Sequence, residues 1–323
     1  MNITKAKLLL SIAAAGVFSL GQARADLAST YLWDGGQSYG LFTLGSSDGG
    51  ALMGDSSFTG STMYGAIGIG TGNQTFDTGT QSTFNGNIYY APGSTVTGTP
   101  GFTGSYSKIQ STTPLMTQQE SNIATGFSTL SSEPNSYAGV TSTVTATGAP
   151  STAGANGFGF NASTGKPTGS MILSGTADNI TLTNPGIAAV FNLSAMTLAG
   201  TTLTLSGSGS YVFNISGAFT LSSKSSIVLT GSITAGNVVF DLEGTSPAIN
   251  YNPSLTAAQN VANGYYTLQG ASTLNGTIVA PDRSVAIIST VTGTPGPSTV
   301  NGAVIADNVI VENSTINQQP ASQ

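Results

Sequence analysis

Paired threonines are the residues of this 323-residue sequence that most suggest surface chemistry. Thr181 and Thr183 form one such pair, with a single residue between them, and Thr202 and Thr204 repeat it farther along the chain. On β-strands, side chains two positions apart point the same way at about 6.6 to 6.8 Å, and adjacent strands lie about 4.8 Å apart. These pairs could therefore form a flat grid of hydroxyl and methyl groups, which could order water for ice binding or offer a stacking ground for a polysaccharide. Thr is also a common outward residue on strands, which leaves a purely structural role open.

Residues suited to catalysis or metal binding are sparse. The sequence has no His and no Cys, which removes the commonest general base and the thiolate metal ligands. Asp241 and Glu243 share one face of an expected strand, where they could hold a Ca²⁺ or act as an acid pair, but solvated outward residues are the simpler interpretation. Arg283, beside Asp282, could mimic the base of a lyase, yet a surface turn after Pro281 explains it as well. We predict no catalytic residue, no metal site and no cofactor.

The N-terminus has the pattern of a secretory signal peptide. Lys5 and Lys7 precede an apolar run from Leu8 to about Leu20, and Ala23-Arg24-Ala25 fits a cleavage site before Asp26. The apolar run is shorter than the roughly 20 residues that a spanning helix needs. We therefore expect the segment 1–25 to be removed on export, and we expect no transmembrane anchor.

Composition excludes a further class of partner. Only 6% of the residues are charged. Removal of the segment 1–25 would leave Lys108, Lys166, Lys224 and Arg283 as the basic side chains, against thirteen acidic ones. Because so few cations cannot neutralise a phosphate backbone, we expect no nucleic-acid partner.

A short repeat indicates how the chain is built. Its pattern is Ser-Thr, an aliphatic or aromatic residue, Asn or Tyr, Gly, a small residue and an aliphatic residue. It occurs at Ser61–Ile67, Ser82–Ile88, Ser272–Ile278 and Ser298–Val304. The first two copies start at positions 61 and 82, a spacing suited to one coil of a parallel β-solenoid, and the Gly suits a corner where a Cβ would not fit.

A second set of phrases predicts stacked strands in the middle of the chain. VFNLS at 190–194 recurs as VFNIS at 212–216 and as VFDLE at 239–243, with NITLT at 179–183, TLTLS at 202–206 and AFTLS at 218–222 between them. Alternation in these phrases places aliphatic residues on one side and Thr or Ser on the other. We expect the aliphatic residues to form inward ladders.

One segment has a helical pattern. Pro114 suits the first turn, and Leu115, Gln119, Ile123, Phe127 and Leu130 follow at spacings of three and four. We predict an α-helix over about 113–131 that covers one flank of the solenoid. The fold class expected is therefore all-β, a parallel β-solenoid with one α-helix packed alongside, forming a single domain over 26–316 with a polar tail at 317–323.

The order of these features resembles the choice-of-anchor A domain, also called a collagen-binding-A-like domain, of secreted bacterial proteins. The resemblance covers roughly residues 41–312 and rests on GAIGIG at 65–70, the helix, VFNLS, NGTIVAP at 275–281 and NGAVIA at 301–306. The sequence is similar, more loosely, to the ice-binding domain shared by many bacteria, fungi and algae, a β-solenoid with a helix alongside. The first resemblance implies an exported, non-enzymatic surface protein concerned with attachment or the extracellular matrix, and it supplies no catalytic residue. Members commonly end in an anchoring signal, and none follows Gln323, which favours release or noncovalent association.

Together these features favour a secreted, non-enzymatic protein of a bacterial surface or matrix with a structural or adhesive role. The alternative is an ice-binding protein that acts through its outward threonines, and the least favoured is a β-helix enzyme that degrades polysaccharides. The expected partner is accordingly an extracellular polymer, a matrix component or an ice surface. The oligomeric state stays open.

Overall fold

The computed structural model describes residues 39–44, 52–53, 61–71, 74–77, 82–97, 107–134, 140–145, 160–161, 166–167, 170–174, 179–244, 267–289 and 296–318. The expected signal peptide at 1–25 lies outside the described residues, so export stays a prediction.

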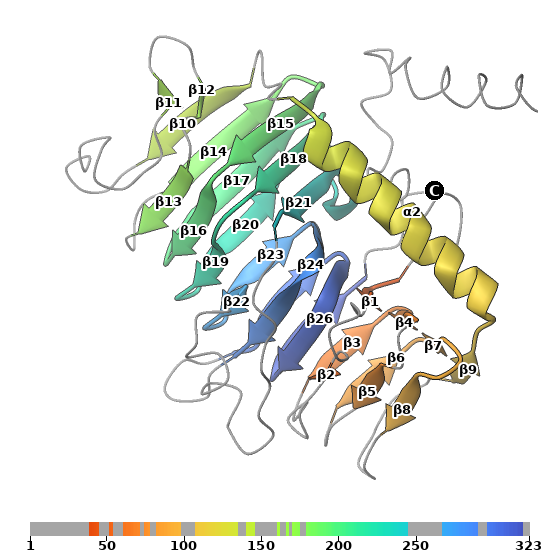
Figure 1. Ribbon diagram of the computed structural model, residues 1–323. Coiled ribbons are helices and arrows are strands. Elements are labelled where there is room, and N and C mark those ends of the chain that lie inside the picture. Colours follow the sequence, from red (N-terminus) through yellow and green to blue (C-terminus); the bar gives the residue numbers. More distant parts are fainter. Residues whose placement is uncertain are drawn as a thin grey trace, which may run out of the picture.

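The described chain is a parallel β-solenoid with one helix alongside, so the predicted fold class is confirmed. Its strands stack in three directions around one core (Figure 1). Pairing is parallel throughout the described strands except for two antiparallel pairs near one end, β10 with β14 and β11 with β12. Parallel stacking places each coil directly on the next, so equivalent residues of successive coils form columns.

The first stack, which we call the threonine sheet, is a nine-stranded sheet. In spatial order it contains β10 (Thr141–Thr145), β14 (Asn179–Asn184), β17 (Thr202–Gly207), β20 (Ser226–Leu229), β23 (Thr273–Asn275), β25 (Ser298–Asn301), β27 (Ser314–Asn317), β3 (Thr62–Tyr64) and β6 (Thr83–Asn85).

The second stack, the helix-covered sheet, lies under the helix. It contains β15 (Ala188–Leu193), β18 (Ser210–Ile215), β21 (Val238–Leu242), the first halves of β24 (Thr277–Ile288) and β26 (Val304–Glu312), then β1 (Leu41–Thr43), β4 (Ile67–Ile69), β7 (Ile88–Tyr90) and β9 (Lys108–Gln110).

The third direction contains β13 (Ser170–Ser174), β16 (Ala195–Ala199), β19 (Phe219–Ser222), β22 (Leu268–Gln269) and the second halves of β24 and β26. A separate three-stranded sheet is formed by β2 (Leu52–Met53), β5 (Thr75–Asp77) and β8 (Thr95–Thr97). Short pieces complete the described structure: β11 (Phe160–Asn161), β12 (Lys166–Pro167) and the 3₁₀ helix η2 (Ala235–Asn237).

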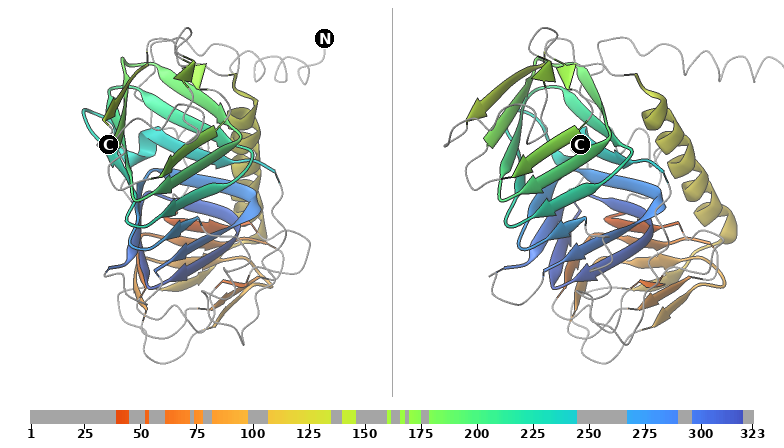
Figure 2. Two further views of the ribbon diagram at one scale, coloured as in Figure 1. Left: turned by 90° about the vertical axis from the view of Figure 1, so that its left-hand side faces the viewer. Right: turned by 60° about the vertical axis from the view of Figure 1, so that its left-hand side comes forward.

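The two ends of the described chain meet in the middle of the stack. Strand β26 pairs with β1, and β27 lies between β25 and β3, so coils from the beginning of the chain continue the stack built by its end (Figures 1 and 2). Strand β27 ends at Asn317, just beyond the boundary expected at 316. Gln318 continues the contact, because its backbone N–H donates to Tyr64 O and its side chain accepts from the Ala66 N–H at 3.1 Å. The single domain expected over 26–316 and the polar tail expected at 317–323 stay predictions.

The predicted stacking of the VFNLS phrases is confirmed. Val190, Val212 and Val239 are register partners on β15, β18 and β21. NITLT and TLTLS also stack on each other, on β14 and β17. The third phrase, AFTLS, does not continue them, since β19 pairs with β16 in another direction of the solenoid. Alternation alone could not distinguish these directions because both bury the same aliphatic pattern.

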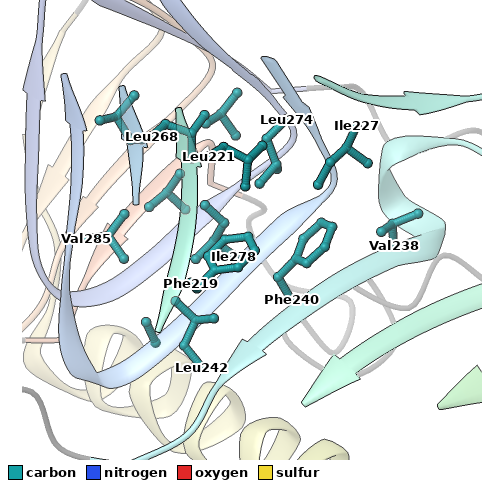
Figure 3. Close-up of a cluster of buried hydrophobic side chains, with 14 of the residues drawn as sticks. Phe219, Leu221, Ile227, Val238, Phe240, Leu242, Leu268, Leu274, Ile278 and Val285 are labelled. Carbon is teal, nitrogen blue, oxygen red and sulfur yellow. The ribbon is translucent and has the colours of Figure 1, made fainter. Parts of the chain in front are cut away.

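The core is filled by columns of like side chains. Phe191, Phe213 and Phe240 are fully buried, and consecutive rings stack with centroids 5.2 Å apart. Figure 3 shows aliphatic and aromatic side chains from the three directions pointing toward one another inside the coil. Such ladders are the inward rows that the alternation predicted.

Helix α2 (Thr113–Ser132) confirms the predicted helix and lies along the helix-covered sheet (Figure 2). Its buried stripe is Met116, Ile123, Gly126 and Leu130, whereas Leu115 is 62% exposed. The prediction that Leu115 belongs to the apolar stripe was therefore wrong. At 100° per residue, Met116 falls within about 20° of Ile123 around the helix, but Leu115 falls about 80° away. None of the described helices is both long enough and apolar enough to span a membrane.

The Gly at the fifth position of each repeat sits at a corner, as predicted. Gly86 has φ +148° and Gly302 has φ +151°. A Cβ on Gly302 would lie 2.0 Å from Gly276 O of the neighbouring coil, and one on Gly86 would lie 2.2 Å from Gly65 O. The corner thus needs glycine both for its backbone conformation and for the close approach of the neighbouring coil.

Replacing Gly302 tests this corner. We expect Gly302→Ala to lower the free energy of unfolding by at least about 2 kcal/mol, because both the left-handed backbone and the close backbone contact oppose a Cβ. The matched control is Gly296→Ala, where φ is +109° but the nearest atom would be 3.7 Å away. Urea unfolding of the two variants and the unaltered protein measures the difference, and equal losses in the two variants would contradict the steric explanation.

Candidate functional site

Hydroxyl groups form one continuous column along the threonine sheet, which we call the hydroxyl column. Strand register places seven residues above one another at one outward position: Thr202, Ser226, Thr273, Thr299, Thr315, Thr62 and Thr83. Asn179 precedes them at the same position of β14. All seven hydroxyl residues are partly exposed, while the next residue of each strand points inward and is buried.

A second outward column, the amide column, runs beside the first. Its residues in register order are Thr181, Thr204, Val228, Asn275, Asn301, Asn317, Tyr64 and Asn85. In its central part, Asn301 Nδ2 donates to Asn275 Oδ1 and Asn317 Nδ2 donates to Asn301 Oδ1, each at 2.9 Å. Asn275 Nδ2 closes the series on Ile227 O at 2.6 Å. These bonds hold the outward amides in fixed rotamers beside the hydroxyl column.

The four threonines singled out in the sequence all lie on this sheet, with an offset in register. Thr181 pairs with Thr204, whereas Thr202 pairs with Asn179 and Thr183 pairs with Ser206. The four threonines therefore form a diagonal arrangement and not the expected two-by-two grid. The residue of the next coil that stacks on Thr181 is Thr204, and not Thr202. Thr183 is exposed and the other three are partly exposed.

The larger part of the surface was present in the sequence as the repeat. In Ser-Thr-x-Asn-Gly, the Thr and Asn are the two outward residues, and the residue between them is the inward one. The structure adds a further copy, Ser314-Thr315-Ile316-Asn317, which joins the upstream and downstream copies into one stack. In the sequence the repeat predicted a solenoid but not a continuous surface, because the order of residues does not show that distant copies are neighbours.

The serine that opens each repeat is buried at a corner. Ser272 and Ser314 are fully buried, and their hydroxyls donate to Gln269 O at 2.7 Å and Glu312 O at 2.8 Å. These bonds occupy backbone carbonyls where the chain turns into the sheet. Each copy of the repeat therefore contains the residues that form one corner and one strand.

The outward positions of the threonine sheet combine hydroxyl and amide groups with little else. No outward residue of β14, β17, β20, β23, β25, β27, β3 or β6 is charged. Val228 and Tyr64 are the large hydrophobic side chains exposed on these strands, at 36% and 47%. Helix α2 packs on the other sheet, against β18, β21 and β24. The face is therefore regular, uncharged and supported from inside by a column of fully buried residues such as Leu274, Val300 and Ile316.

Residues considered for catalysis behave differently from the sequence expectation. Asp241 is fully buried, so the interpretation as a solvated outward residue was wrong for it, while Glu243 is partly exposed. The Asp241 side chain does face outward from the core, but α2 covers that part of the sheet, and Ser131 donates to Asp241 Oδ2 at 2.9 Å. Within the described ranges, no three His, Cys, Asp or Glu residues gather closely enough to hold a metal ion.

Arg283 is not on a turn but within β24, at the irregularity between Ala280 and Ser284. Its guanidinium donates to backbone carbonyls, including Gly217 O at 2.7 Å, Ser216 O at 2.8 Å and Glu243 O. Burial lowers the pKa of this group. Arg283 therefore joins two coils by satisfying carbonyls at their corners.

Several solved structures align with this chain at low similarity. An ice-binding protein from the Antarctic ascomycete Antarctomyces psychrotrophicus aligns with a TM-score of 0.44 and 16% identity over 92% of this chain and 98% of that chain. An ice-binding protein from an Arctic yeast aligns with a TM-score of 0.41 and 14% identity, over 85% and 97%. An ice-binding protein domain from Shewanella frigidimarina aligns with a TM-score of 0.40 and 15% identity, over 85% and 98%.

No family model matches the sequence, and no curated protein matches it. The resemblance to the choice-of-anchor A domain therefore stays a prediction.

The amide column generates a stability prediction. We expect Asn301→Ala to lower the free energy of unfolding by about 1 kcal/mol, because it removes the side-chain hydrogen bonds to Asn275 and Asn317 at a partly exposed position. The control is Thr299→Ala on the same strand, which leaves the amide bonds in place and should change stability by less than about 0.5 kcal/mol. Chemical unfolding measures both, and equal effects would contradict a stabilising amide ladder.

Proposed function

We propose that the protein binds ice through the threonine sheet, with the hydroxyl column as the centre of the contact. The regularity of the side chains on this face supports the proposal: hydroxyl and methyl groups repeat at one position of consecutive strands, about 4.8 Å apart. Thr181 and Thr204 extend the same chemistry in the neighbouring column. A regular array of this kind can hold water molecules in a matching array.

The chemistry of the face favours ice over a polysaccharide. Protein sites for sugars use aromatic faces together with directed polar or charged groups, and the exposed aromatic residue on the described part of this sheet is Tyr64. The Asn side chains at the centre are already engaged with one another, which reduces the groups free to read an individual sugar. The other outward groups form a repeated, uncharged lattice of hydroxyls and methyls.

Rigidity is the second requirement for holding ordered water, and the sheet provides it. The inward neighbours Leu274, Val300 and Ile316 are each fully buried, and the amide ladder restricts the column beside the hydroxyls. Side chains that are already ordered lose little conformational entropy when they meet a solid surface. A secreted structural or adhesive role, suggested by the sequence, stays a prediction beside this proposal.

Bulky substitutions in the hydroxyl column test the proposal. We expect the unaltered protein to shape growing ice crystals and to show thermal hysteresis, and we expect Thr299→Tyr combined with Thr315→Tyr to abolish most of both activities. The pair Thr202→Tyr and Thr204→Tyr should do the same toward one end of the sheet. Large rings at these positions would replace the hydroxyls and interrupt their regular spacing.

The matched control is Thr117→Tyr, at an exposed position on α2, which should keep full activity. Circular dichroism of each variant checks that the solenoid is intact. Normal ice growth at high concentration of the unaltered protein would contradict ice binding, and equal loss in the control would contradict the assignment to this face.

A further inference from the structure

A second ladder of polar side chains lies beneath the C-terminal turn of α2, away from the threonine sheet. Asn192, Asn214 and Asp241 are register partners on β15, β18 and β21. Asn192 is exposed, Asn214 is 2% exposed and Asp241 is fully buried. The ladder therefore leads from solvent into a closed contact between sheet and helix.

The orientations of the two amides are fixed by their partners. Asn214 Nδ2 donates to Leu130 O of the helix and to Asn192 Oδ1, each at 2.9 Å. Asn192 Nδ2 donates to Glu133 O at 3.3 Å. Leu130 O and Asn192 Oδ1 can only accept hydrogen bonds, so the Asn214 atom that contacts them must be its nitrogen, Nδ2. The other terminal atom of the Asn214 amide is therefore its oxygen, Oδ1.

Two buried oxygens of this ladder have no hydrogen-bond partner. They are Asn214 Oδ1 and Asp241 Oδ1, on neighbouring strands at the same register position. An ionised Asp241 offers only acceptors, so it cannot satisfy Asn214 Oδ1 and would leave both oxygens orphaned. One hydrogen on Asp241 Oδ1 would satisfy both.

The contact of the other carboxyl oxygen, Asp241 Oδ2, is consistent with a hydrogen on Asp241 Oδ1. Ser131 Oγ lies 2.9 Å from Asp241 Oδ2 and 2.9 Å from Phe127 O, and a hydroxyl has a single hydrogen to donate. If Ser131 donates to Asp241 Oδ2, the carboxyl is fully bonded when its own hydrogen is on Oδ1.

We propose that Asp241 is an uncharged carboxylic acid at neutral pH, that its hydrogen bridges Asp241 Oδ1 to Asn214 Oδ1, and that its ionisation releases the last turn of α2. The acid acts as the equivalent of an asparagine, the residue found at the two preceding positions of the ladder. The exposed amide column gives the precedent, because Asn301 Nδ2 there donates to the oxygen of the preceding coil.

The electrostatic surroundings oppose a negative charge at this position. Burial raises the pKa of Asp241 from 3.8 to about 8; the Ser131 hydrogen bond acts against the rise, and Glu243, just beyond the end of β21, adds to it. The carboxyl also faces the C-terminal end of α2, where the partial negative charge of the helix disfavours another anion.

Charged groups on the neighbouring elements do not compensate for such a charge. Glu133 follows the last turn of α2 and is itself acidic, and the register partner on β24 is the apolar Val279. Farther along β24 are Asp282 and Arg283, and the Arg283 guanidinium donates to backbone carbonyls. On β18 the register partner is the neutral Asn214.

The direction of the pH effect follows from proton linkage. The folded protein keeps this proton up to about pH 8, while the unfolded chain releases it near its ordinary value of 3.8. The folded state therefore binds more protons between these pH values, and its stability falls as pH rises through that window. The contact between the end of α2 and the sheet should weaken most above pH 8.

The test compares the full chain with Asp241→Asn, which supplies a permanent N–H donor in place of the proton. Thermal unfolding at pH 5, 7 and 9 should show the Tm of the unaltered protein falling with pH by more than that of Asp241→Asn, which should also be the more stable of the two at pH 9. The control is Asp282→Asn, an exposed carboxyl, which should follow the unaltered protein.

A direct measurement keeps the proposal falsifiable if the variant does not fold. Carbon NMR of carboxyl groups in the unaltered protein should show one Asp titrating near pH 8, with hydrogen exchange in 127–133 accelerating above that pH. An Asp241 carboxyl that is ionised at pH 6, or an Asp241→Asn variant with the same pH dependence as the unaltered protein, would overturn the proposal.

Discussion

Stacking of each residue on its equivalent in the next coil is the constraint on which the structure depends. Every column must be made of side chains that tolerate their neighbours in the column about 4.8 Å away. Phe191, Phe213 and Phe240 do so by ring stacking, and Asn275 and Asn301 do so by donating from one amide to the next. Like charges at that spacing repel, which gives a physical reason for a chain in which only 6% of residues are charged.

The route of the chain follows from the same constraint. The first described coils stack on coils from the end of the chain. The polypeptide must therefore cross the height of the solenoid before it begins the remaining coils. Helix α2 makes this crossing: its 20 residues span about 30 Å, comparable to the roughly 34 Å covered by seven strand spacings between β7 and β15. The helix thus connects the two ends and covers one sheet, leaving the threonine sheet on another side.

Local regularities of the sequence were sufficient for the fold class but only partly for the register. The VFNLS phrases stack because similar phrases present matching inward residues, Phe followed by Leu or Ile. The position of Ser314–Asn317 could not be predicted, because its partners, β25 and β3, come from opposite parts of the chain. Thr181 was assigned to the correct face, but it pairs with Thr204, whereas the repeated pairs suggested Thr202. The turns between strands vary in length without changing the pattern of the strands. Similar phrases therefore predict which face of the solenoid a residue lies on. Only the strand register in the structure shows which hydroxyls are neighbours.

The two amide ladders show how covering one face changes its chemistry. On the threonine sheet, Asn317 lies at a partly exposed position, where water can satisfy any amide group that its neighbours do not. Beneath α2, Asp241 is fully buried, and an unsatisfied oxygen has no such alternative. The same stacking rule therefore yields an uncharged, solvent-facing surface on one side. On the other side it yields a closed contact in which every hydrogen must be accounted for.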